Sequence, residues 1–489
     1  MPQTTLSPVV LPEITTVIAE HLEHGCLVTC VQVCKSWYRV FAPHLYEHVR
    51  FPLTRYGKAP EKTPWEGLQK FSSQVRTISV SAPEFPSLES WGPECRHLTT
   101  LYLGPFHIIP QQSLWFSGLM ALVEINPNIH TLQLVLSGNI ADTILCKHKL
   151  LRNLPGLKNL LLVKDSRQRS CRWSQAAFQE IMAIGPQLDQ LVYNLKWDQD
   201  KWTSEKIPKA IEWQMWTGLT SLNVYAQKNC GGVELVERCP NLKHLSLKAI
   251  ETNEHACAIL NVILQHCRSG YPTRLEHLEI SKSLGYQETI QPVLLELFRA
   301  CAASSALKSF CYGDFSMSDE SLGVLMDCHG KTLEEVGLTG LSGCRPTQMH
   351  TVLSRCHNLR IFKCVIDVGM RWDCLEESSW ACPNLRILHI ESGKRQAFDG
   401  SGLYPNRTSM SLQREFWKNI GKLKSLRLLH LNIRSLAYKA LSISYGGAKH
   451  LAGLEDLMEL VIPSDKDFMG QRDKEYLLQR RPFLRINYL

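Results

Sequence analysis

Apolar residues recur along most of this 489-residue chain in the motif LxxLxL, in which each L is leucine or another apolar residue. A short strand gives this pattern when its apolar side chains all point into the core of a solenoid. Fourteen matches between residues 75 and 457 have a mean spacing of about 29 residues. The matches begin at Val75, Leu98, Ile129, Leu157, Leu188, Leu219, Leu242, Leu275, Leu307, Leu333, Leu359, Leu385, Leu426 and Leu457. The pattern therefore predicts one strand per repeat, with helical stretches such as 290–303 and 321–328 between strands.

The residues that flank the second leucine of each match are expected to form a binding face. Side chains alternate across a strand, so these residues point away from the core. Polar and aromatic residues predominate there, and Ile361, Ile387 and Leu428 add exposed apolar positions. The candidate target-binding residues on this face are Tyr102, Asn223, His244, His277, Lys363, His389 and His430. Several repeats separate the first two histidines from the last two, so we expect single polar contacts from each and no metal site.

Three matches share a lead-in of the form CxNL, at 239–242, 356–359 and 382–385. This lead-in resembles the cysteine-containing leucine-rich repeat that is common in F-box proteins. The resemblance implies an α/β fold, in which about 14 repeats over residues 75–489 build a horseshoe solenoid with helices on its convex side. Such an array offers an extended concave surface that suits a protein partner. A different α/β fold is the alternative, and the regular spacing and the absence of a Gly-rich phosphate loop argue against it.

The first fifty residues have the apolar spacing of two or three short helices. Pro12 suits the first turn of a helix, and apolar residues follow at helical spacing up to Leu22. After a break at His24 and Gly25, a second apolar run extends from Leu27 until Pro43 ends it. So short a segment buries little apolar area by itself, so an exposed apolar edge on it is expected to be covered by a partner.

The segment 6–51 resembles the F-box of substrate receptors in cullin-RING ubiquitin ligases. The resemblance rests on Leu11-Pro12, the apolar positions after it, Val33-Cys34-Lys35-Ser36-Trp37 and Leu45-Tyr46. It implies that a Skp-type adaptor, and through it a cullin scaffold, binds the segment, with Val33, Cys34 and Trp37 in the internal core. The residues implied to contact the adaptor are Leu11, Pro12, Ile14, Ile18, Leu22 and Leu27.

Two features of this region leave alternatives open. The turn at 23–26 reads Glu-His-Gly-Cys, where many F-boxes have an Asp-Pro or similar acidic turn. The helices could also form a cap on the first repeat, with no role in ubiquitin transfer. Residues 52–74 are then either a linker or part of that cap.

Composition narrows the class of protein. No run of 18 apolar residues and no signal-peptide pattern occurs, so we expect a cytoplasmic or nuclear protein with no membrane partner. The 18 cysteines include no CxxC pair and are expected to be reduced, mostly buried small hydrophobes. A net charge of +8 spread over this length argues against a dedicated nucleic-acid binder.

The sequence contains no recognisable catalytic motif: no GxSxG, HExxH or GxxxxGK[ST] occurs. We therefore expect neither enzymatic activity nor a cofactor. The leading hypothesis is a substrate receptor, whose F-box recruits a ubiquitin ligase while the repeats bind a target protein that the sequence does not identify. The main alternative is an interaction scaffold with an F-box-like cap and no ligase role.

Overall fold

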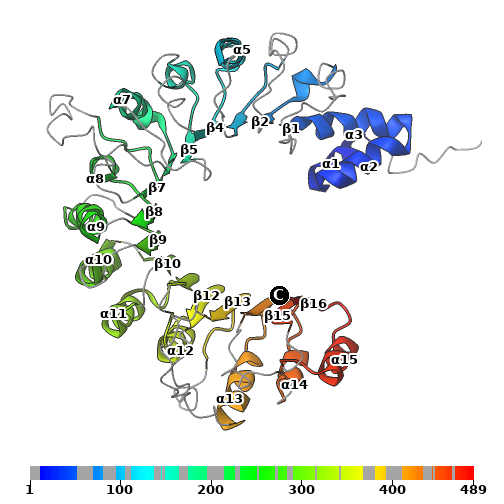
Figure 1. The fold of residues 1–489 in the computed structure, drawn as a ribbon, viewed down its shortest axis with the longest axis vertical. Coiled ribbons are helices and arrows are strands. Elements are labelled where there is room, and N and C mark those ends of the chain that lie inside the picture. Colours follow the sequence, from blue (N-terminus) through cyan, green and yellow to red (C-terminus); the bar gives the residue numbers. More distant parts are fainter. Residues whose placement is uncertain are drawn as a thin grey trace, which may run out of the picture. The chain divides into compact units, whose positions relative to one another are not determined.

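A computed structural model of the chain describes residues 12–51, 70–80, 95–104, 112–136, 145, 149–164, 175–194, 214–225, 232–250, 253–269, 274–283, 290–304, 306–313, 317–340, 343–366, 380–392, 410–432, 443, 446–464 and 468–489. The chain divides into two compact units, residues 1–219 and 220–489. Each unit combines helices with a ladder of parallel strands (Figure 1). Within the described residues, no helix has the length and apolar character that a membrane span needs.

The first unit begins with three helices that lead directly into a strand. Its helices and strands are α1 (Pro12–His21), α2 (His24–Val33), α3 (Lys35–Glu47), β1 (His48–Phe51), η2 (Ser72–Gln74), β2 (Thr77–Val80), β3 (Thr100–Leu103), α5 (Gln112–Glu124), β4 (Thr131–Leu136), η6 (Leu150–Asn153), β5 (Asn159–Lys164), α7 (Gln175–Ile184), η7 (Gly185–Gln187) and β6 (Gln190–Asn194). Strands β1 to β6 pair in chain order, each parallel to the next.

The second unit repeats the strand-and-helix arrangement. Its elements are β7 (Ser221–Tyr225), α8 (Gly232–Glu237), β8 (His244–Ile250), α9 (Asn253–Arg268), β9 (His277–Ser283), α10 (Ile290–Ser304), β10 (Ser309–Gly313), α11 (Asp319–His329), β11 (Glu335–Leu338), α12 (Pro346–Arg355), β12 (Ile361–Ile366), β13 (Ile387–Ser392), α13 (Met410–Ile420), β14 (Leu428–Asn432), α14 (Gly447–Ala452), β15 (Glu459–Ile462), α15 (Gln471–Arg480) and β16 (Arg485–Tyr488). Strands β7 to β16 also pair in chain order and in parallel.

The LxxLxL positions form the core in both units, as the pattern predicts. Every apolar position of the fourteen matches is buried, and the most exposed of them, Leu338, is only 5% exposed. The second position of each match also pairs in register with that of the next repeat, for example Leu388 with Leu429 and Leu429 with Leu460. The mixed α/β fold and its parallel strands, consistent with a repeat solenoid, are thus confirmed.

Buried polar side chains connect one repeat to the next. His329, at the end of α11, accepts a hydrogen bond from the Leu307 backbone N–H at its Nδ1 (3.2 Å), and its Nε2 lies 3.0 Å from the Phe298 carbonyl oxygen. Asn126 accepts a hydrogen bond from the Leu98 N–H in the same way. These side chains thereby give hydrogen-bond partners to buried backbone groups that the strands and helices do not pair.

Three features differ from the sequence-based expectation. Helix α3 continues through Pro43 to Glu47, although this proline was expected to end the helix. Strand β1 follows at once and pairs with β2, so the end of the 6–51 segment belongs to the strand ladder. At the other terminus, β16 adds a strand after the last predicted match.

Candidate functional site

Helix α1 has one buried face and one exposed apolar face. Thr15 and Ala19 are buried on the inner face. Ile14, Val17 and Ile18 lie on the opposite side and are 42%, 55% and 40% exposed. These three residues have the i, i+3, i+4 spacing of a single helical stripe. Packing within the N-terminal helices therefore leaves an apolar stripe uncovered, which we call the outer stripe.

The six residues expected to contact an adaptor do not all lie on the outer stripe. Ile14 and Ile18 do. Leu27 is only 7% exposed and packs in a core cluster with Phe41, and Leu22 is partly buried against the same cluster. Pro12 is the first residue of α1, and Leu11 lies outside the described residues. Leu22 and Leu27 thus support the helices from within.

The residues expected to build the core of these helices are arranged differently. Trp37 does pack on the core cluster, with its ring 5.3 Å from that of Phe41. Val33 and Cys34 are exposed, so the expectation that they are internal was wrong. They lie where α2 ends and α3 begins, and Cys34 is in an extended conformation there. Hydrogen bonds from the Ser36 side chain and the Trp37 backbone lower the pKa of the Cys34 thiol.

Helix α3 also contacts the rest of the first unit. The ring of Tyr46 stacks on Phe71, just before η2, at a centroid distance of 5.0 Å. Tyr38 meets the same ring edge-on, and the Lys70 ammonium lies 5.4 Å from the centroids of both Tyr38 and Phe71. The helices are therefore anchored on the beginning of the strand ladder through α3, while the outer stripe of α1 remains exposed.

Along each strand, the side chains that alternate with the buried ones point to the other side of the sheet. We call this side the open face of each unit. In the first unit, Tyr102 is half-buried between its register partners Ser79 and Gln133. Further along the same row, Leu161 and Val192 are half-buried and adjacent in register. Neither was among the expected binding residues, although the alternation that points to Tyr102 also assigns both to this face. They make an aliphatic area on β5 and β6.

At the start of the second unit, the open face carries a stacked histidine pair. His244 and His277 are register partners, and their rings stack at 4.1 Å between centroids. Burial lowers the pKa of both side chains, and the proximity of His277 lowers that of His244 further. Asn223, the register partner of Ser246 in the next row, has a buried side-chain oxygen with no hydrogen-bond partner among the described residues.

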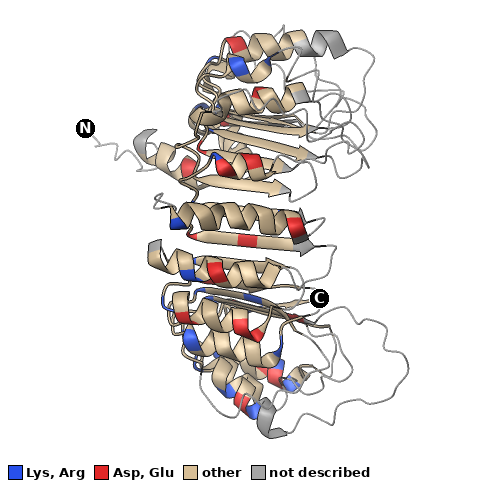
Figure 2. Ribbon diagram, turned by 90° about the vertical axis from the view of Figure 1, so that its left-hand side faces the viewer, with Lys and Arg blue, Asp and Glu red and all other residues tan. Residues whose placement is uncertain are grey.

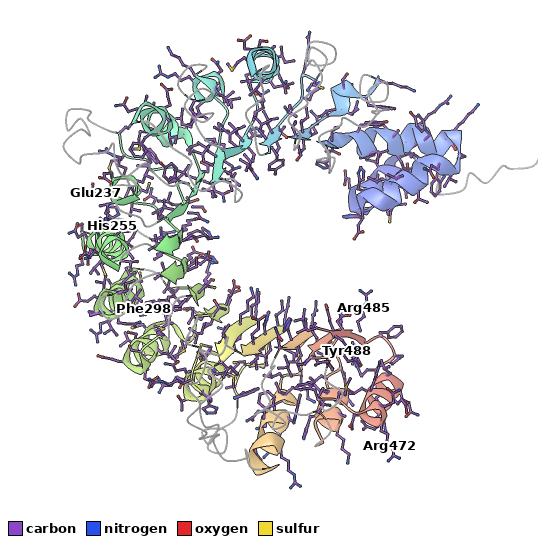
Figure 3. The ribbon with its side chains drawn as sticks, viewed as in Figure 1. Glu237, His255, Phe298, Arg472, Arg485 and Tyr488 are labelled. Atoms are coloured by element: carbon purple, nitrogen blue, oxygen red, sulfur yellow. The ribbon has the colours of Figure 1, made fainter. Side chains whose placement is uncertain are left out.

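Further along the second unit, three aliphatic residues form one row of the open face. Ile361, Ile387 and Leu428 are consecutive register partners on β12, β13 and β14. All three are half-buried, so they are less exposed than the sequence suggests, because their neighbours in the row shield them. The row continues into Glu459 and Arg485, the latter labelled on β16 in Figure 3.

The next row of the open face contains Lys363, His389 and His430, again as consecutive register partners. The Lys363 ammonium lies 3.3 Å from a carboxylate oxygen of Glu335. The rings of His389 and His430 stack at 3.8 Å, and the Glu391 carboxylate lies beside both. Burial and the proximity of His389 lower the pKa of His430. The repeat pattern predicts that the two histidines are neighbours, because they occupy the same position of consecutive LxxLxL matches, although 41 residues separate them along the chain.

Charged residues are interspersed along both units, and both signs alternate over the helices (Figure 2). Ion pairs cross between repeats, as between Lys308 and Glu276 and between Arg360 and Glu334. Such exposed pairs contribute little to stability.

The cysteines of the CxNL lead-ins are structural. Cys239 and Cys382 are buried, and their thiols donate to backbone carbonyl oxygens, at 3.0 Å to Leu235 and 2.9 Å to Leu353. Burial raises the pKa of both thiols and raises the pKa of Cys356 to about 12. No disulfide joins any of the described cysteines. These three therefore serve as small buried hydrophobes, as expected from the sequence.

No protein-family model matches the chain. No curated protein matches it either. Among solved structures, it is similar to a chain in the crystal structure of the Rad7 and Elc1 complex of yeast, with a TM-score of 0.41 and 11% identity over 97% of this chain and 92% of that one. So low a similarity carries no functional argument.

Proposed function

We propose that this chain is a substrate-recognition adaptor of a Skp-cullin-F-box ubiquitin ligase. In this proposal, residues 6–51 act as an F-box and bind a Skp-type adaptor, which connects the chain to a cullin scaffold. The repeats form a leucine-rich-repeat solenoid whose open face binds a target protein. The outer stripe of α1 is the observation on which the proposal chiefly rests.

The outer stripe supports docking because folding of the chain does not explain it. Ile14, Val17 and Ile18 keep 40% or more of their surface exposed, whereas the inner face of the same helix is buried. Single exposed apolar residues are common, but three on one helical stripe form a contiguous patch of the kind that marks protein interfaces. Val28, on α2, is also partly exposed. Covering these side chains removes apolar area from water and favours association.

The open faces carry side chains suited to contacts with a target. Apolar positions lie on both units, at Leu161 and Val192 in the first and at Ile361, Ile387 and Leu428 in the second. Polar and charged side chains surround them, as in protein interfaces with an apolar centre and a polar rim. Binding a target on these faces while the F-box binds the ligase would raise the effective concentration of target lysines near the ubiquitin-charged enzyme. Catalysis then belongs to the partners.

An interaction scaffold without a ligase role is the second candidate. It is favoured by the contacts of α3 with Phe71 and by the pairing of β1 with β2, which suit a helical cap on the first repeats. A helical cap explains why the inner face of α1 is buried and why Trp37 and Tyr46 are packed against other rings. It does not require the outer stripe to be apolar.

A pull-down of purified full-length protein with a purified Skp-type adaptor separates the two candidates. The test variant is Ile14→Glu combined with Ile18→Glu, because both side chains are exposed and the change should leave folding intact. The control is Met458→Glu, which makes the same kind of change at an exposed apolar residue of the second unit. The ligase proposal expects binding by the wild type and the control and loss of binding in the double variant. Absence of binding by the wild type, or equal binding by all three, would contradict it.

A further inference from the structure

Three potential metal ligands meet on the open face of the second unit. They are His389 and Glu391 on β13 and His430 on β14. We propose that these side chains form a binding site for a divalent transition metal ion of the Zn²⁺ class. The site would depend only on two neighbouring strands, so the proposal stands whether or not the chain recruits a ubiquitin ligase.

The strand register brings the ligands together. His389 and His430 are direct register partners in a parallel pair, so their side chains leave the same side of the sheet next to each other. The two rings stack at 3.8 Å with an angle of 19° between their planes. Glu391 is two residues after His389 on the same strand and therefore points to the same face. A rigid sheet thus places two imidazoles and a carboxylate without help from a loop.

The three ligand atoms lie near enough to bind one ion, which would replace the hydrogen bond that now joins His389 and Glu391. Nε2 of His389 lies 2.8 Å, and Nε2 of His430 lies 3.9 Å, from the same Oε1 of Glu391. All three ligand atoms lie within 4.8 Å of one another. Ligand atoms at about 2.0–2.2 Å from a tetrahedral Zn²⁺ are roughly 3.3 Å apart. Both measured separations from Oε1 differ from that value by about half an ångström, which small side-chain rotations would remove.

The surroundings of His430 also support a bound ion. Its Nε2 atom is buried and has no hydrogen-bond partner among the described residues, and it lies 3.9 Å from Oε1 of Glu391. A buried polar atom without a partner is costly and calls for an explanation such as a bound ion. A metal ion between His430, His389 and Glu391 would give this nitrogen the partner that it lacks.

The chemistry of the ligands selects the class of ion. Neutral imidazole suits zinc, copper, nickel and iron, whereas calcium and magnesium prefer oxygen ligands. The side chains of His389, His430 and Glu391 keep 29%, 17% and 39% of their surface exposed, so an ion can reach them from solvent. The neighbouring Lys363 would repel a cation, but Glu335 pairs with its ammonium group. Three protein ligands leave a coordination position open for water or for a side chain of a partner.

The chain provides its own control in the other histidine pair. His244 and His277 are also register partners with stacked rings. Among the described residues, however, no third ligand completes a metal-binding group around them. Removal of these two imidazoles should therefore leave the proposed site intact.

Isothermal titration of the full-length, chelator-treated protein with Zn²⁺, and its absorption spectrum with Co²⁺, test the proposal. The variants are His430→Ala, Glu391→Gln and, as control, His244→Ala combined with His277→Ala. We expect one tight equivalent of Zn²⁺ in the wild type and in the control. Loss of a residue that only hydrogen-bonds to a metal ligand typically lowers metal affinity by about 10- to 100-fold. The affinity of His430→Ala for Zn²⁺ should fall by more than this. Co²⁺ should give visible bands of a tetrahedral site with nitrogen and oxygen ligands.

Three results would overturn the proposal. The first is no tight equivalent of Zn²⁺ in the wild type. The second is equal affinity in the wild type and in His430→Ala, with both proteins folded by circular dichroism. The third is a thiolate-to-cobalt charge-transfer band, which would assign the ion to cysteines such as the exposed Cys26 and Cys34.

Discussion

Gly185 and Trp216 provide a sharp test of how the repeats of the first unit pack. Trp216 is almost completely buried, and its indole lies directly against Gly185 at the start of η7. A Cβ atom on residue 185 would lie 1.9 Å from Cε2 and 2.0 Å from Cζ2 of the indole. Because carbon atoms pack at about 3.5–4.0 Å, the ring would have to move by about 1.5 Å or more. The surrounding core leaves no room for that movement without repacking.

We therefore expect Gly185→Ala to destabilise the first unit. Overpacking of this kind typically costs about 1–3 kcal/mol. For a unit of this size that cost corresponds to a fall in the midpoint of thermal unfolding of about 2–12 °C. Gly323→Ala is the matched control, since nothing lies within 4 Å of its added Cβ inside helix α11. The control should be neutral or stabilising by up to about 1 kcal/mol, because alanine favours a helix over glycine.

Thermal unfolding followed by circular dichroism measures the loss, and a double-mutant cycle with Trp216→Leu identifies its cause. Shortening Trp216 leaves a cavity and is itself destabilising, but it also removes the atoms that the new methyl group would strike. The two changes should then couple favourably by about 1–3 kcal/mol. Additive effects, or a midpoint in Gly185→Ala equal to that of the wild type, would refute this account of the packing.

Two further predictions concern titratable groups. Burial lowers the pKa of His329 in the folded state below its value in the unfolded chain. As the pH falls, this histidine is therefore protonated in the unfolded chain first. The stability that His329 contributes is complete above about pH 6.5 and is lost below it. Protonation of its Nδ1 would also break the hydrogen bond from the Leu307 N–H. The plot of unfolding free energy against pH should therefore have a shallower slope between pH 5 and 7 in His329→Gln than in the wild type. An unchanged slope would contradict this prediction. Among the cysteines, Cys34 is exposed with a lowered thiol pKa, whereas burial raises the pKa of Cys239. Iodoacetamide labelling at pH 7, followed by mass spectrometry, should modify Cys34 well before Cys239, and the reverse order would be inconsistent with the structure.

The core of the repeats could be predicted from the sequence because one physical rule governs it. A strand that buries every second side chain must carry apolar residues at fixed positions, and each LxxLxL match obeys this rule. Leu388, Leu429 and Leu460 are buried register partners for this reason. The CxNL cysteines were predictable in the same way, as small side chains at a recurring buried position.

The candidate sites could be predicted only in part. Helical spacing identifies the apolar residues of α1 and α2, but packing against α3 decides which of them stay outside. Ile14 and Ile18 remain exposed, whereas Leu27 is buried and Val33 is exposed, contrary to its expected internal position. The neighbouring positions of His389 and His430 follow from the repeat pattern, whereas the approach of the Glu391 carboxylate to both imidazoles depends on side-chain conformations that no sequence pattern reveals.

Protection of α1 on adaptor binding tests the central claim most directly. Hydrogen–deuterium exchange of the full-length protein, with and without a saturating Skp-type adaptor, reports which backbone amides the complex covers. The proposal predicts slower exchange in peptides that span residues 12–22, around the exposed Ile14, Val17 and Ile18, with peptides of the second unit unchanged. Unchanged exchange in α1, or protection confined to the repeats, would contradict the assignment of these helices as the ligase-recruiting module.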